Sequence, residues 1–203
     1  MNTIETIIQN RKATRSYDPN FEIDPKTTKK LIKLGQMAPS SFNIQHCKFV
    51  VIQNQKLRQK IREVAMDQKQ ITDASLFIIV CAKLDAWKES ISHKWAHVDE
   101  QVQGFIRKSI DEFYQSNIEM QRDEAIRSCG MASQNLLLAA EGMGFQSGAL
   151  VGFDFQKVAK LIQLPDNHII SNFVVIGKGN EINSLKSSRL PMDDVLIKNT
   201  FQL

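Results

Sequence analysis

Apolar residues recur along the chain either at helical spacing or in short continuous runs, and the two patterns alternate. The first helix is predicted at residues 4–10, and the second begins with Asp24 as N-cap and Pro25 in its first turn and ends before Pro39. Further strands and helices are predicted at 47–53 (strand), 57–65 (helix), 75–83 (strand), 123–141 (helix), 154–164 (helix) and 169–177 (strand). Residues 132–140 are apolar nearly all round, which indicates a helix at the centre of a domain. This succession is typical of an α/β or α+β domain.

Three segments follow the pattern less closely. Residues 86–120 hold Trp87 and Trp95 among many charges, and their irregular spacing predicts one or two surface helices that lie over another part of the protein. Residues 144–154 are rich in turn-forming types, and the tail from Leu185 onward has no clear partner within the chain. Because no repeat or linker interrupts the sequence, we expect a single domain over residues 1–203.

Composition narrows the class of protein. Apolar residues make up 42% of the 203 residues, and the net charge is +4. The Lys and Arg residues are interleaved with Asp and Glu, whereas a nucleic-acid-binding protein usually concentrates its basic residues. No apolar run approaches the roughly 20 residues that cross a bilayer. Cys47, Cys81 and Cys129 are widely spaced and form no CxxC pair, which argues against a disulfide framework. We therefore expect a soluble cytoplasmic protein that binds neither nucleic acid nor membrane.

Several motifs resemble nucleotide-binding, catalytic or metal-binding motifs but lack the spacing or geometry that these functions need. The glycines of residues 142–148 follow a helix with the spacing GxGxxxG, whereas a dinucleotide loop follows a strand. A nucleophile built on His46 and Cys47 is excluded because adjacent strand residues point to opposite faces. His93 and His97 would share a helix face and could bind a metal, although such pairs on exposed helices are usually only solvated. Cys81 and Cys129 are most simply core residues.

Three segments carry groups that suit an anionic ligand. Arg11 and Arg15 lie four residues apart at the end of the first helix, and arginine offers planar, bidentate donors to phosphate. Residues 187–191 read SSRLP, which places a further arginine beside hydroxyl groups, and residues 39–43 read PSSFN directly before a buried strand. Together these segments suggest a phosphorylated cofactor.

The order of the motifs resembles that of a known family. R-x-x-x-R-x-Y, APSSxNxQ, DASLFIIVCAK, AA-x-G-x-G, VGFD and SRLP follow one another from residue 11 to residue 191. This is similar to the flavin-dependent nitroreductases, in particular the branch of the oxygen-insensitive NAD(P)H nitroreductases and dihydropteridine reductases. The resemblance implies an α+β fold with a mostly antiparallel sheet flanked by helices, and an intertwined homodimer that holds two FMN molecules at its interface. It also implies a C-terminal tail exchanged onto the partner's sheet and a lid formed by residues 86–120.

The resemblance further implies which residues bind FMN. Arg11 and Arg189 would bind the phosphate, with Ser187 where some relatives have a second phosphate-binding lysine, and Arg15 would lie near flavin N1 and O2. The backbone of Val151 and Gly152 would face flavin N5. Pro39, Ser40, Ser41 and Asn43 would come from the other subunit and contact the isoalloxazine and ribityl groups. Asp67 and Gln70 would lie at the pyrimidine edge of the flavin. Ala13 is the last member of the predicted set. No catalytic side chain and no metal ligand are predicted.

The function implied is that of an FMN-dependent oxidoreductase that takes hydride from NADH or NADPH and passes it through flavin N5 to nitroaromatics, quinones or similar acceptors in ping-pong fashion. Three alternatives stay open. The first is a non-enzymatic FMN-binding or sensory protein whose lid, through Trp87 and Trp95, blocks the nicotinamide pocket. The second is a reductive flavoenzyme of the same fold with another substrate, and the third is a metal hydrolase built on His93 and His97. Gln70, where relatives often have a lysine, predicts a lower flavin reduction potential.

Overall fold

The computed structural model describes residues 3–180 and 188–201. The strands are β1 (Cys47–Val51), β2 (Leu76–Lys83), β3 (Gln146–Leu150) and β4 (His168–Gly177). The helices are α1 (Ile4–Asn10), α2 (Pro25–Gln36), α3 (Gln55–Glu63), α4 (Gln70–Asp73), α5 (Glu100–Tyr114), α6 (Ile118–Gly142), α7 (Phe155–Leu161) and α8 (Met192–Val195), with short 3-10 helices η1 (Ser41–Asn43) and η2 (Ala86–Lys88). The predicted α+β class is confirmed.

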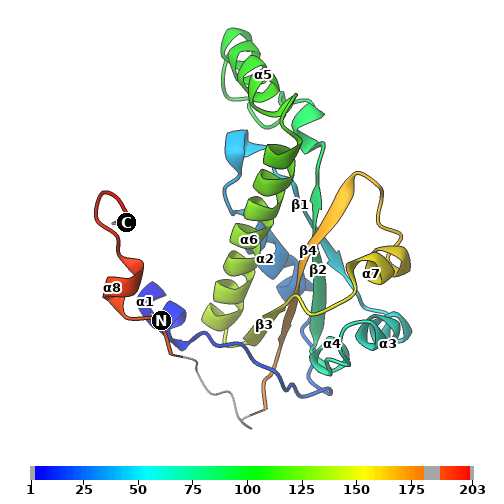
Figure 1. Cartoon of the computed structure of the whole chain (residues 1–203). Coiled ribbons are helices and arrows are strands. Elements are labelled where there is room, and N and C mark those ends of the chain that lie inside the picture. Colours follow the sequence, from blue (N-terminus) through cyan, green and yellow to red (C-terminus); the bar gives the residue numbers. More distant parts are fainter. Residues whose placement is uncertain (1–2, 181–187, 202–203) are drawn as a thin grey trace.

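The four strands form one antiparallel sheet in the order β1-β2-β4-β3. Helices α2 and α6 lie on one side of this sheet, and α3, α4 and α7 lie on the other (Figure 1). Each side has its own apolar core, because successive strand residues point to opposite faces. Phe77 and Phe173 belong to the core beneath α3 and α7, whereas Ile78 and Val174 belong to the core beneath α6.

Local signals account for most of the helices. The Asp24 carboxylate accepts hydrogen bonds from the backbone N–H groups of Lys26 and Thr27, both at 2.9 Å, and Pro25 opens α2 as predicted. The apolar segment within residues 123–141 lies inside α6, whose buried residues include Ala132, Leu136 and Ala140. The strands predicted at 47–53, 75–83 and 169–177 correspond to β1, β2 and β4.

One prediction of irregular structure was wrong. The segment 144–154 contains β3, whose Ser147, Gly148 and Ala149 have little intrinsic strand preference and are held in register by β4. The tail contains the short helix α8, which no sequence pattern indicated. Strand β3 therefore depends on contacts that are distant in sequence.

Residues 86–120 build a third, smaller core beyond the end of the sheet. Helix α5 and η2 pack around Trp87, whose ring stacks on that of Tyr114 with centroids 6.0 Å apart. Trp95 and Phe42 pack against the same core, so this segment is attached to the loop that precedes β1. In the described part of the chain, no helix is both long and apolar enough to cross a bilayer.

Candidate functional site

The segment that carries Arg15 is held against the sheet by backbone contacts on both sides. The Thr14 N–H donates to the Ser147 carbonyl of β3 at 3.0 Å, and the Asp18 N–H donates to the Lys178 carbonyl after β4 at 2.9 Å. Gly148 permits this approach, because a β carbon at that position would lie 3.0 Å from the Thr14 carbonyl oxygen. Residues 13–18, which we call the N-terminal strap, are thereby fixed along the edge of the sheet.

A cavity of about 310 Å³ lies beside the N-terminal strap. Ala13 and Arg15 of the strap, Gln70 of α4 and Val151 after β3 line it, so four residues of the predicted set come together from three distant segments. Gly152 follows directly, and its carbonyl oxygen accepts a hydrogen bond from the Gln68 side chain at 2.8 Å. The fold therefore assembles one side of the predicted site.

Gln68 is a member of this cavity that sequence reasoning missed. Its Nε2 binds Gly152, and its Oε1 lies 3.5 Å from Nε2 of the buried Gln70. Two amides thus stand side by side at the cavity wall, with both donor and acceptor atoms. The only available signal was its position between the predicted residues Asp67 and Gln70.

Asp67 itself points elsewhere. Its carboxylate accepts a hydrogen bond from Arg62 Nε at 2.7 Å, its side chain is 72% exposed, and it does not line the cavity. The hydrogen bond to Arg62 holds the pKa of this carboxyl below its usual range. Met66 and Asp67 both have left-handed φ, 52° and 51°, so this turn has an uncommon backbone conformation next to the cavity.

The second group of predicted residues lies in the loop 39–46, at the other end of α6 from the N-terminal strap (Figure 1). Phe42, Asn43 and Gln45 have φ of 49°, 53° and 60°, values that side chains other than glycine rarely adopt. The Ser40 hydroxyl stabilises the turn by accepting a hydrogen bond from the Gln45 N–H at 2.9 Å. Pro39 and Asn43 are exposed, and Ser40 and Ser41 are half-buried.

Two side chains of residues 86–98, Lys94 and Trp95, bind this loop, and sequence reasoning missed both roles. Lys94 donates from Nζ to the Ile44 carbonyl at 2.8 Å, and Trp95 donates from Nε1 to the Phe42 carbonyl at 3.3 Å. The Lys94 ammonium also lies 3.8 Å from the Glu89 carboxylate. Burial lowers the pKa of Lys94, and Glu89 opposes that shift.

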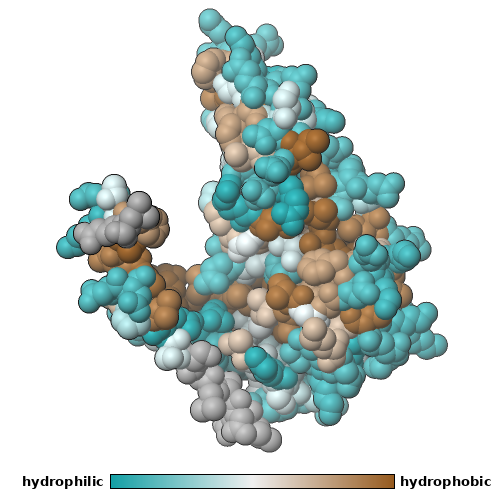
Figure 2. Space-filling model, viewed as in Figure 1, coloured by the Kyte–Doolittle hydropathy of each residue, from teal (hydrophilic) through white to brown (hydrophobic). Residues whose placement is uncertain are grey.

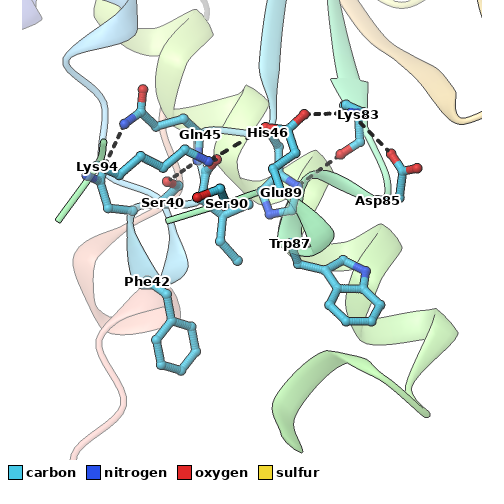
Figure 3. A network of polar contacts seen from close by, with 12 residues as sticks. Ser40, Phe42, Gln45, His46, Lys83, Asp85, Trp87, Glu89, Ser90 and Lys94 are labelled. Atoms are coloured by element: carbon cyan, nitrogen blue, oxygen red, sulfur yellow. Dashed lines mark hydrogen bonds and ion pairs between the residues drawn. The ribbon is translucent and has the colours of Figure 1, made fainter. Parts of the chain in front are cut away.

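His46 closes the loop as a fully buried residue. Its Nδ1 lies 3.1 Å from the Lys83 carbonyl oxygen, so Nδ1 carries the proton and donates it (Figure 3). Nε2 is then an acceptor that is buried without a hydrogen-bond partner among the described residues. His46 lines, with Ser40, Lys94 and Ser128, a cavity of about 160 Å³. Burial lowers the pKa of this imidazole, which favours its neutral form.

The predicted phosphate-binding residues lie in two segments, the end of α1 and the start of the C-terminal tail. Arg11 caps the end of α1 and is half-buried, and Arg189 is exposed at the start of the tail. Ser187 lies outside the described residues. The roles of all three stay predictions.

Metal binding receives no structural support in the described residues, where no three His, Cys, Asp or Glu side chains gather as a metal site. His93 and His97 are both exposed, and the His97 ring packs on Trp95 with centroids 5.7 Å apart. Neither histidine belongs to the cavity beside Arg15.

Comparison with known proteins identifies the family. The family model for the nitroreductase family matches residues 8–178. Protein DrgA of Synechocystis sp. is 42% identical over 181 residues, which cover 89% of this chain and 86% of DrgA. YodC of Bacillus subtilis, which bears the name of an NAD(P)H nitroreductase, is 26% identical over 96% of this chain and 97% of its own. A solved structure from Exiguobacterium sibiricum, described as a nitroreductase in complex with FMN, has a TM-score of 0.88 at 21% identity and 98% coverage of both chains.

The chain belongs to the nitroreductase family. The resemblance drawn from the order of its motifs is therefore confirmed, and so is the predicted nitroreductase-like fold. This membership makes the protein an oxidoreductase of the nitroreductase type.

Proposed function

We propose that the protein is an FMN-dependent NAD(P)H oxidoreductase that reduces nitroaromatics, quinones or similar electrophilic acceptors. The observation that carries this proposal is the cavity in which Arg15, Gln70 and Val151 meet. Its donors and acceptors suit a flavin, whose pyrimidine ring presents carbonyl and N–H groups to side-chain amides. The names of YodC and of the Exiguobacterium protein supply the nicotinamide and FMN part of the proposal.

When bound, FMN would supply the redox chemistry, taking hydride from NADH or NADPH and delivering it to the acceptor in a separate ping-pong step. The protein contributes position and charge. Arg15 would place a cation where negative charge develops, and a charge in a partly desolvated cavity is worth more than the same charge in water. Gln68 and Gln70 would orient the ring, and the Val151–Gly152 backbone would approach it closely.

A homodimer would complete the site. Ser40, Ser41 and Asn43 lie at the other end of α6 from Arg15, and among the described residues neither of these two cavities is lined by members of both halves of the predicted set. A second copy would bring its own loop 39–46 to the cavity beside Arg15. We therefore infer that each FMN site draws on both subunits.

The C-terminal tail supports such a dimer, because its apolar side chains are exposed and the tail stands away from the sheet (Figures 1 and 2). The exposed apolar residues are Leu190, Met192, Val195, Leu196, Ile197 and Phe201. A contiguous apolar patch of this kind usually marks a protein interface. The tail is therefore a candidate for contact with a partner subunit.

A groove next to the open edge of β1 would receive the partner's tail. It has a volume of about 860 Å³ and runs between α2 and the segment around Arg58, with Val51 and Leu76 in its floor. Lys29 and Lys33 stand along it, and the tail carries Asp193 and Asp194. Apolar and charged groups are thus matched between the groove and the tail.

The non-enzymatic alternative requires Trp87 and Trp95 of the lid to block the nicotinamide pocket. Trp87 is buried against Tyr114, and Trp95 is held by its hydrogen bond to the Phe42 carbonyl. Both indoles therefore belong to the core of the 86–120 segment. Neither lines the cavity beside Arg15.

Absorbance spectra of the purified protein in air-free buffer, before and after NADH or NADPH, test the proposal. We expect flavin bands that bleach and that return when a nitroaromatic or a quinone is added. Arg15→Gln should weaken FMN binding by about one to two decades, the worth of one charged hydrogen bond. Lys60→Gln, which removes a cation from the exposed side of α3, is the matched control. A colourless protein that FMN cannot reconstitute would refute the function, and flavin bands that never bleach would favour a binding protein.

A further inference from the structure

The three cysteines of the chain lie in three different elements, and the side chains of two of them are in contact. Cys47 begins β1 and Cys129 lies in α6, and their Sγ atoms are 3.2 Å apart. Both belong to the apolar layer between the sheet and α6. Cys81 of β2 belongs to the opposite layer, because it pairs with Lys48 in the β1–β2 register while Cys47 pairs with Ala82.

Access to this pair comes from one side only. Cys129 is fully buried, whereas Cys47 is half-buried and lines the 160 Å³ cavity with Lys48, Lys94 and Ser128. A small oxidant in that cavity would therefore reach Cys47 first. Cys129 would be reached only through Cys47.

The hydrogen bonds of the two thiols orient them for reaction with each other. The Cys129 S–H donates to the Cys81 carbonyl oxygen, with 3.4 Å between sulfur and oxygen, so a sulfur lone pair of Cys129 is left facing Cys47. The contact with Cys47 and burial both raise the pKa of Cys129, so its sulfur keeps the proton that the leaving hydroxyl would take. Burial raises the pKa of Cys81 to about 12, and its sulfur faces the other core.

We propose that Cys47 and Cys129 form a peroxide-responsive pair that closes an intramolecular disulfide. Hydrogen peroxide oxidises the Cys47 thiol to a sulfenic acid and releases one water. The Cys129 sulfur then attacks the Cys47 sulfur, the sulfenic S–O bond breaks, and the hydroxyl leaves with the Cys129 proton as a second water. Two thiols are thus oxidised by two electrons, and one peroxide is reduced to two waters.

The geometry asks for a small adjustment. A disulfide needs the sulfurs about 2.05 Å apart, so the two sulfurs, now 3.2 Å apart, must approach by roughly 1.1 Å. The bond would tie the first residue after the loop 39–46 to the central helix α6. This proposal rests on the cysteines alone and does not depend on the function proposed above.

Intact-mass spectrometry of the whole protein, first reduced, then freed of reductant and treated with stoichiometric hydrogen peroxide, tests the proposal. We expect a loss of two hydrogens, a linked peptide pair that contains Cys47 and Cys129, and full reversal by dithiothreitol. Cys81→Ala is the matched control and should still form the bond. Cys129→Ser should stop at the sulfenic acid, which dimedone captures on Cys47, and Cys47→Ser should resist the same dose of peroxide.

Three results would overturn it: no mass loss in the parent protein, a linked peptide that contains Cys81, or a disulfide between two chains. The peptide map of the parent protein decides the matter even if a variant fails to fold. Because the readout is mass, it is unaffected by flavin content or by enzymatic activity.

Discussion

Replacing Gly148 by alanine should detach the N-terminal strap from the sheet. The added β carbon would lie 3.0 Å from the Thr14 carbonyl oxygen, where ordinary contacts begin at 3.4 Å, so one of them must move by about 0.4 Å. Val175 Cγ2 at 3.5 Å and the Tyr17 hydroxyl at 3.6 Å enclose the same space. The clash is with backbone, so no flexible side chain can absorb it.

The magnitude follows from the contacts at stake. Overpacking costs about 1–3 kcal/mol, and a weakened Thr14 N–H to Ser147 hydrogen bond costs about 1 kcal/mol more. The lower entropy of the unfolded chain with alanine returns about 0.5–1 kcal/mol. We expect a net loss of about 1–3 kcal/mol in the free energy of unfolding, or about 2–12 °C in Tm for a chain of this length. Because Arg15 moves with the strap, FMN affinity should fall about tenfold, which is ~1.4 kcal/mol.

Urea unfolding at fixed protein concentration and FMN titration of the apoprotein measure both effects. Gly104→Ala is the matched control, since nothing lies within 4 Å of its new β carbon and alanine favours the interior of α5. It should leave FMN affinity unchanged and raise stability by a few tenths of a kcal/mol to about 1 kcal/mol. If Gly148→Ala were as stable as the parent and bound FMN equally well, the close approach of strap and sheet would not position Arg15.

Three further predictions concern charge and assembly. In urea titrations from pH 5 to 8, the free energy of unfolding should be constant above about pH 6.5 and fall below it, because the unfolded chain protonates His46 while burial lowers the pKa of His46 in the folded protein. His46→Asn should reduce the slope of this fall. The remaining slope should come from His168, whose pKa burial also lowers. In a potentiometric titration, Gln70→Lys should raise the flavin reduction potential by roughly 20–60 mV, the effect of one nearby cation worth about 1–3 kcal/mol. The neutral variant Gln70→Met should leave the potential nearly unchanged. A lower potential with lysine would contradict the placement of Gln70 at the flavin. Arg15→Gln and Asn43→Ala chains that carry different tags and are expressed together should form hybrid dimers. In such a hybrid one of the two sites is intact, so its activity should recover to about half that of the parent dimer. Hybrids no more active than either variant homodimer would exclude a shared site.

Local signals in the sequence determined most of the helices and the buried strands. The Asp24 cap and Pro25 fix the start of α2 through hydrogen bonds within one turn. The apolar run from Leu76 to Ala82 needs only burial on both faces to become a strand, and it lies fully buried in β2. The order of the motifs was enough to indicate the family, because each motif is contiguous and can be read directly.

Only the tertiary structure decided what these motifs do together. Strand β3 exists because β4 pairs with it, and its Gly148 matters because a segment 134 residues earlier in the chain crosses it, at Thr14. The amide of Gln68, the support of the loop by Lys94 and the contact between Cys47 and Cys129 all join residues that no local pattern relates. Hydrogen bonds and packing depend on proximity in space, and the sequence reveals proximity only where residues are neighbours along the chain.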